Sequence, residues 1–192
     1  MNLKLKRRFI LSRDLKILRA LVDVIIIRED DIYISVAYRK GRAFCRYDRD
    51  FKLKARVEEQ DLLKLGFGDF RCMTVDHNGN MVAVGQIRPD TVTIFTLNGG
   101  GKIARTSVIN DFPLLESLCC DAWGNLYLHS PLKEYPFYKY SPDLQLVGGF
   151  GVYPKKSDSV VDRMARLSMG RDGSVNLLFE NSPASLIRYS SE

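Results

Sequence analysis

The sequence offers few side chains of the kinds that catalyse reactions or bind metals. Its 192 residues include two histidines, His77 in a predicted turn and His129 at the end of a predicted strand. His129 would suit a ligand or base role only if it faced a channel, and a packing role otherwise. No zinc-protease, nucleophile-elbow or P-loop motif occurs. We therefore predict no catalytic residue, no metal and no cofactor.

Two aspartates recur at the same position of a repeated turn. They are Asp76 in Asp-His-Asn-Gly-Asn and Asp121 in Asp-Ala-Trp-Gly-Asn. Carboxylates repeated in this way are compatible with calcium binding, but an Asp side chain also caps its own turn by accepting backbone hydrogen bonds. The capping role needs no second ligand, so we favour it.

The four cysteines, Cys45, Cys72, Cys119 and Cys120, form no Cys-x-x-Cys pair. Cys119 and Cys120 are adjacent in a predicted strand, so their side chains point to opposite faces. The pattern indicates buried thiols in a reducing compartment and gives no support to a zinc site.

The positive charge is concentrated near the beginning of the chain. Residues 1–20 hold seven basic residues and one acidic residue, and the remainder balances 22 of each. Such a segment can bind RNA or an anionic surface, or it can protect the edge of a sheet from pairing. We favour the second role. No signal peptide and no membrane-spanning run is visible, which predicts a cytoplasmic protein if the N-terminus is complete.

A turn signature followed by an alternating apolar strand repeats along the chain. Aligned on Asp31, Asn80, Asn125 and Ser174, its spacings are 49, 45 and 49 residues. Predicted third strands end at Tyr47, Leu97, Tyr140 and Tyr189, with spacings of 50, 43 and 49. Because the turn positions and the third-strand ends repeat with matching periods, they indicate one supersecondary unit that occurs several times.

Each repeat contains four short strand patterns and no convincing helix. In the second repeat they cover residues 70–75, 81–86, 91–97 and 102–108, separated by Asp/Asn/Gly turns. Residues 61–65 and 159–164 are candidates for single helical turns. Units of four antiparallel strands with this period predict an all-β fold, a β-propeller. A β-sandwich or barrel with accidental self-similarity is the alternative.

The third repeat resembles those of NHL-type and related six-bladed β-propellers. The resemblance lies in Asp121, Gly124, Asn125 and the strand after them, in Tyr140-Ser-Pro-Asp143, and in Gly148-Gly-Phe-Gly151. It implies an architecture and points towards protein or RNA partners. Some six-bladed propellers are lactonases or lyases with a channel metal, so the resemblance also keeps an enzyme as an alternative.

The number of repeats falls short of a six-bladed ring, which would need about 270 residues at this period. We expect one domain or fragment. Residues 1–20 would end one blade, residues 21–60, 61–110 and 111–157 would form full blades, and 158–192 a partial blade. Alternatively, the terminal strands share one blade and close a four-bladed ring. An incomplete ring would leave open edges for self-association or a protein partner.

The connections between second and third strands are the candidate binding surface, because loops on a rigid scaffold commonly carry function. They are residues 38–42, 86–90 and 130–137. The candidate binding residues are Arg39, Arg42, Arg88, Trp123, His129, Lys133, Tyr135 and Phe137. The sequence thus favours a non-enzymatic binding or scaffold module with a protein partner. RNA binding through the basic N-terminal segment and the arginine-rich loops is a further alternative.

Overall fold

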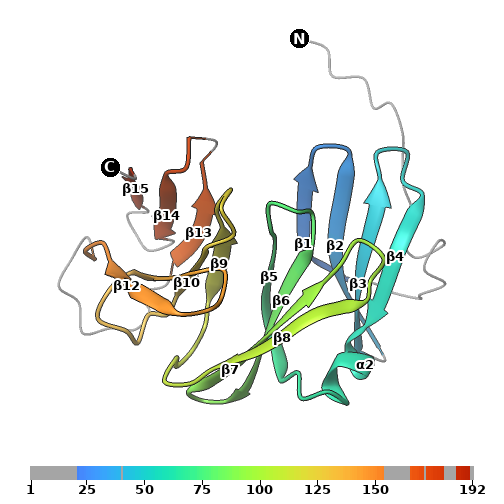
Figure 1. The fold of residues 1–192 in the computed structure, drawn as a ribbon, viewed down its shortest axis with the longest axis horizontal. Coiled ribbons are helices and arrows are strands. Elements are labelled where there is room, and N and C mark those ends of the chain that lie inside the picture. The colour runs from blue at the N-terminus through green and yellow to red at the C-terminus, as the bar shows by residue number, and fades with distance from the viewer. Residues whose placement is uncertain (1–20, 40, 154–164, 171, 180–184, 191–192) are drawn as a thin grey trace, which may run out of the picture.

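The computed structural model describes residues 21–39, 41–153, 165–170, 172–179 and 185–190. They form four antiparallel sheets arranged as the blades of a four-bladed propeller, which confirms the all-β prediction (Figure 1). The described strands form four separate small sheets and not the two packed layers of a sandwich. The expectations for residues 1–20 and 159–164 lie outside the described residues.

The strands of each blade follow one another in chain order. The first blade contains β1 (Leu21–Arg28), β2 (Asp31–Tyr38), β3 (Gly41–Asp48) and β4 (Leu53–Glu58), and the second β5 (Asp69–Val75), β6 (Met81–Arg88), β7 (Thr91–Leu97) and β8 (Ile103–Ile109). The third contains β9 (Ser117–Cys120), β10 (Leu126–His129), β11 (Phe137–Tyr140) and β12 (Leu146–Phe150), and the fourth β13 (Ala165–Met169), β14 (Val175–Phe179) and β15 (Ser185–Tyr189). The helical turn expected near residues 61–65 is α2 (Glu59–Leu63), between the first two blades.

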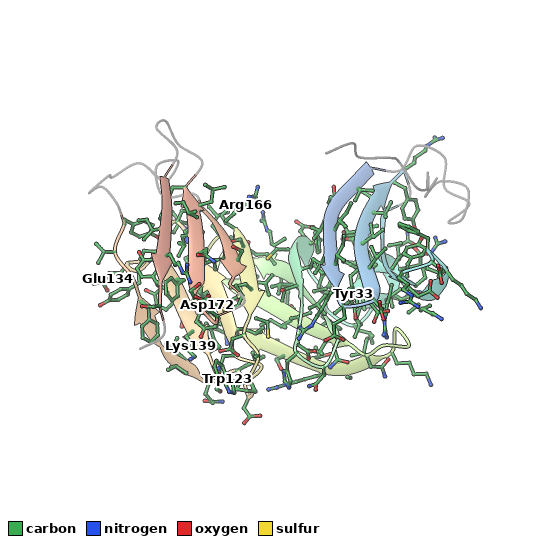
Figure 2. All side chains as sticks on the ribbon, turned by 90° about the horizontal axis from the view of Figure 1, so that it is seen from above. Tyr33, Trp123, Glu134, Lys139, Arg166 and Asp172 are labelled. Atoms are coloured by element: carbon green, nitrogen blue, oxygen red, sulfur yellow. The ribbon has the colours of Figure 1, made fainter. Side chains whose placement is uncertain are left out.

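The first strands of successive blades are neighbours: β1 contacts β5, β5 contacts β9, and β9 contacts β13. They lie inside the arc, and the last strands of the first three blades lie outside it. Viewed from above, the first and fourth blades stand at the two ends of the arc, joined through the second and third (Figure 2).

Side chains alternate between two interblade cores, which explains the apolar strands. On β6, Met81 and Ala83 pack towards the first blade, whereas Val82 and Val84 pack towards the third. A strand with period 2 presents successive side chains to opposite faces, and an inner blade is buried on both. A third core joins the third and fourth blades around Leu177.

The first blade departs from the repeat at its first turn. Arg28 pairs directly with Asp31, and Glu29 in between has φ 52°. This two-residue connection is shorter than the five-residue turns of the later blades. The first blade therefore does not have the five-residue turn that the alignment on Asp31 predicts. A two-residue turn with positive φ also matches the twist of a hairpin, and it takes the place of the longer turn here.

Candidate functional site

The connections divide between two faces of the arc. The turn face carries residues 29–30, 48–52, 76–80, 98–102, 121–125, 141–145 and 170–174, on the upper side of Figure 1. The loop face carries residue 39, residues 59–68 with α2, and residues 89–90, 110–116 and 130–136. Trp123 and Glu134, at opposite ends of β10, mark these faces and lie well apart in the third blade (Figure 2).

Six five-residue turns on the turn face share one hydrogen-bond pattern. In each, the first residue's N–H donates to the fifth residue's carbonyl, and the fourth residue's N–H donates to the first residue's carbonyl. The fourth residue has positive φ in all six: Phe51, Gly79, Gly101, Gly124, Leu144 and Gly173. The pattern is a type I turn followed by a residue in the left-handed region, a common three-residue hairpin connection.

The carboxylate of Asp121 finds all its hydrogen-bond donors within its own turn and the strand that follows it. Its Oδ1 accepts from the backbone N–H groups of Trp123 and Asn125, each at 2.9 Å. Its Oδ2 accepts from Asn125 Nδ2 at 2.7 Å and Tyr127 Oη at 3.1 Å. Burial and the neighbouring carboxylate raise the pKa of Tyr127, which keeps its hydroxyl a donor. With four internal donors, this carboxylate acts as a cap.

Asp76 repeats the arrangement, accepting from Asn78 N, Asn80 N and Asn80 Nδ2, each at 2.9 Å. The predicted capping role of both aspartates is confirmed. Within the described ranges, no three His, Cys, Asp or Glu side chains are grouped closely enough to hold a metal ion. No described helix is long and apolar enough to cross a membrane.

A central depression of about 740 Å³ opens among the inner strands and turns of all four blades. Arg28, Cys120, Asp121, Trp123 and Asp172 are among its lining residues. Trp123 is 68% exposed, whereas Asp121 is engaged in its turn and Asp172 pairs with Arg188. The depression has one large exposed aromatic ring and carboxylates that already have partners.

The cysteines are free thiols that belong to the interior. Cys45, Cys72 and Cys119 are buried and Cys120 is half-buried. Burial raises the pKa of each thiol, to about 11 for Cys45 and about 12 for Cys120. Thiols that stay protonated are poor nucleophiles and poor metal ligands.

Four of the candidate binding residues lie on the loop face with surface available. Arg39 and Arg88 are exposed, and Tyr135 is 38% exposed. Lys133 is half-buried, with Nζ 5.6 Å and 5.2 Å from the ring centres of Phe112 and Tyr138. Trp123 is exposed but lies on the turn face, so the structure does not bring it together with these four.

The other three candidates are engaged within the fold. Phe137 is 4% exposed, stacks on Phe150 and belongs to the core between the third and fourth blades. His129 is fully buried, and its Nδ1 lies within hydrogen-bond distance of the Pro136 carbonyl. Arg42 pairs with Asp23 at 2.8 Å and covers a phenylalanine ring. These three side chains are not placed to meet a ligand.

The loop face contains a groove of about 430 Å³ between the second and third blades. Its described lining is Asp69, Arg71, Gln86, Ile87, Arg88, Pro89, Leu114 and Leu132. Gln86, Ile87, Arg88, Pro89 and Leu132 lie in the connections 86–90 and 130–137 that the sequence predicts as a binding surface, and Arg88 is the one also predicted as a binding residue. The other three lining residues enter the groove without such a prediction: Asp69, Arg71 and Leu114.

Two β-bulges shape this groove. The pairing of β5 with β6 shifts register between Phe70 and Cys72, and that of β6 with β7 shifts between Gln86 and Arg88. The extra residues are Arg71 and Ile87, and both line the groove. A bulge leaves one residue out of the ladder and re-aims its side chain, and bulges are frequent beside functional sites.

Glycines permit the close backbone approach under the groove. A Cβ on Gly68 would stand 2.1 Å from the Gln86 carbonyl oxygen, and a Cβ on Gly85 would stand 2.7 Å from the Gly68 carbonyl oxygen. Neither position has room for a side chain. These glycines are the one sequence signal, in hindsight, that something unusual happens at this end of β5 and β6.

The groove walls are tied together across the two blades. Phe112 N donates to Asp90 O at 2.8 Å, and Leu114 N to Pro89 O at 3.4 Å. Ser130 Oγ donates to Pro113 O. Leu114 itself has φ 48°, an uncommon conformation for a leucine.

No protein-family model and no curated protein matches this sequence. Among solved structures, the chain is similar to protein BF0058 from Bacteroides fragilis NCTC 9343, with a TM-score of 0.50 and 10% identity over 88% of this chain and 49% of that one. It is also similar to uncharacterized protein lmo1340 from Listeria monocytogenes EGD-e, with a TM-score of 0.42 and 11% identity over 83% and 51% of the two chains.

The likeness to the Bacteroides protein shows a common fold and nothing about activity. The chain spans about half the length of the solved structures it matches.

Proposed function

We propose that this chain is a non-enzymatic binding module whose loop face receives a protein partner. The observation that carries the proposal is the surface between α2 and the loop at 130–136. Leu63, Leu65, Ile87 and Leu132 are 47%, 59%, 47% and 49% exposed there. Arg39 and Arg88 are exposed on the same face.

Apolar side chains beside cations are a suitable composition for a protein interface. Leucine and isoleucine supply the area whose removal from water drives association, and arginines supply directed hydrogen bonds to an acidic partner. The hydrogen bonds among loops 89–90, 110–116 and 130–136 hold part of this surface in place before binding. A rigid surface loses less conformational entropy when it binds.

A displayed random-peptide library, selected on the immobilised protein, tests the proposal. The enriched peptides are then measured against Ile87→Ser/Leu132→Ser on the loop face and against Ile103→Ser/Trp123→Ser on the turn side. We expect about tenfold or greater loss with the first pair and little change with the second, because each buried aliphatic side chain contributes about 1–2 kcal/mol. Equal loss with both pairs, or no enrichment, would refute the proposal.

We also propose that the four blades belong to a larger, NHL-like ring of six blades, completed by further blades or by a second chain. Val24 and Ile26 pack towards the second blade, whereas Ile25 and Ile27 are 58% and 72% exposed. At the other end, Leu178 and its strand partner Leu186 are 42% and 68% exposed. Both end blades thus present aliphatic side chains on the face away from their neighbour.

Light scattering coupled to size-exclusion chromatography tests self-association through these faces. We expect an oligomer whose mass falls towards that of one chain in Ile25→Ser/Ile27→Ser. If the wild-type protein is a monomer at all concentrations, association between copies is wrong. Completion by a different chain then remains the form of the proposal to test.

A further inference from the structure

The groove between the second and third blades combines features that specify a ligand more narrowly than a protein partner in general. Its lining holds two arginines, one aspartate, four apolar side chains and a buried amide. Arg71 and Arg88 are both exposed, and among the described residues neither forms a salt bridge. The acidic side chain in the lining is Asp69, which is exposed at the start of β5. The lining therefore has a net positive charge.

Gln86 is a polar side chain in the groove wall with an incomplete set of partners. It is 6% exposed, and its Nε2 donates to the Pro89 carbonyl at 2.7 Å. Its Oε1 is buried and accepts no hydrogen bond from the described part of the chain. A buried acceptor without a donor costs free energy, so an N–H group from outside, directly or through one water, would be favourable here.

Apolar side chains flank these polar groups. Ile87 and Leu132 are 47% and 49% exposed, and Leu114 also belongs to the lining. The bulges place Arg71 and Ile87 beside Arg88, so the same groove lining offers cationic and apolar groups. An extended peptide, whose side chains alternate in direction every residue, can present carboxylates and aliphatic groups to such a surface.

We propose that the groove binds an extended acidic peptide segment of a protein partner. Side-chain carboxylates of the segment pair with Arg71 and Arg88, its aliphatic residues lie against Ile87 and Leu132, and a backbone N–H satisfies Gln86 Oε1. Guanidinium groups bind carboxylates through two parallel hydrogen bonds, which favours acidic segments over neutral ones. This inference rests on the proposed function and names the class of segment that the loop face receives.

The probe is a peptide of alternating leucine and glutamate that carries an uncharged fluorophore, with both ends blocked so that the only carboxylates are in side chains. Its binding to the intact chain is measured by fluorescence anisotropy at low and high salt. We expect saturable binding that weakens with salt. The same peptide with glutamine in place of glutamate is expected to bind about tenfold more weakly.

Arg71→Gln and Arg88→Gln each remove one cation from the groove. We expect threefold to tenfold weaker binding of the acidic peptide for each variant, on the order expected for one charge-assisted pair. Arg49→Gln is the matched control, because Arg49 is an exposed arginine on the turn face, paired with Asp30 at 3.6 Å. It makes the same change in net charge, and we expect it to leave the affinity unchanged.

Four results would overturn the inference. Equal weakening by Arg49→Gln would reduce the effect to net charge. Tighter binding of a single-stranded uridine oligonucleotide, lost in Arg88→Gln, would assign the groove to RNA. Equal binding of the glutamine and glutamate peptides, both lost in Ile87→Ser/Leu132→Ser, would leave the proposed function standing and the acidic specificity wrong. Absence of binding by either peptide, with library peptides still selected, would also refute the acidic specificity alone.

Discussion

The turn face and the loop face are formed by the two ends of the same strands, but they differ in how fully their polar groups are paired. On the turn face, six connections repeat one hydrogen-bond pattern, and Asp121 alone accepts four internal hydrogen bonds. On the loop face, the connections differ in length and conformation, and two arginines and an amide oxygen lack partners within the described residues.

The difference separates architecture from candidate function. A feature that recurs in every blade serves what all blades need, which is a closed hairpin with satisfied polar groups. The bulge at Arg71 has a counterpart in the first blade, between Val22 and Val24, whereas the bulge at Ile87 is the only one between second and third strands in the described blades. A feature that occurs once has no such general purpose. We therefore expect substitutions on the turn face to affect stability and substitutions on the loop face to affect binding.

The largest expected effect comes from Asp121→Ala. Removing a buried carboxylate that accepts four hydrogen bonds should lower the free energy of unfolding by about 3 kcal/mol, since its donors lose their partner. Urea unfolding followed by circular dichroism measures it. Asp76→Ala removes a half-buried cap, and its cost should be clearly smaller. Equal costs would show that burial does not set the strength of these caps.

High pH should lower the free energy of unfolding through the buried Cys45 thiol. Burial raises the pKa of the Cys45 thiol to about 11, so the unfolded chain loses this proton first as pH rises. The stabilisation is complete below the unfolded pKa near 9 and disappears as pH passes the folded value. At pH 10, this difference in pKa should have lowered the free energy of unfolding by about 1.4 kcal/mol relative to its value below pH 8.

Unfolding of the wild type and Cys45→Ala at pH 8 and pH 10 tests this expectation. The wild type should lose more stability between the two pH values than the variant. Parallel losses in the two proteins would mean that the Cys45 thiol is not protected by burial.

Gly124→Ala should cost about 1 kcal/mol, because a residue at φ +87° strains any side chain. The new Cβ would also stand 3.0 Å from the imidazole Cε1 of His77. Thermal unfolding gives the change. Gly148→Ala is the control: its φ is ordinary and its new contact, with Phe150, is 3.4 Å, so a comparable loss there would contradict the conformational argument.

The smallest change in stability is expected for Arg88→Gln. An exposed arginine without an ion pair among the described residues should alter the free energy of unfolding by less than about 0.5 kcal/mol. Urea unfolding beside the Asp121→Ala protein measures both. A loss above 1 kcal/mol would give Arg88 a structural role and remove the contrast between the faces.

Much of the blade structure could be predicted from the sequence because it depends on local patterns. The expected strands at 81–86 and 91–97 lie within β6 and β7. The self-capping of Asp76 and Asp121 is confirmed, since a side chain that bonds to its own turn needs no distant partner.

The candidate site was harder to predict because it depends on register and on which face a side chain occupies. The sequence places Phe137 at the junction of the aromatic loop 130–137 and a strand over 137–140. It does begin β11, but the pattern does not say that its side chain is buried in the core. Arg71 and Ile87 enter the groove through bulges, which shift the register by one residue without a fixed sequence signal. Trp123 lies in a first-to-second-strand turn and Arg88 in a second-to-third-strand connection, so an antiparallel blade already puts them at opposite ends, and the structure leaves both exposed.

The most direct test of the two-face account is to map the acidic leucine–glutamate peptide onto the protein by amide NMR. We predict shifts at Gln86, Arg88 and Leu114, with the indole N–H of Trp123 and the amide of Gly79 unchanged. The single tryptophan gives an unambiguous turn-face signal. Shifts centred on Trp123 and Gly79, with Gln86 and Leu114 unmoved, would contradict the account and place the ligand on the face that we assign to architecture.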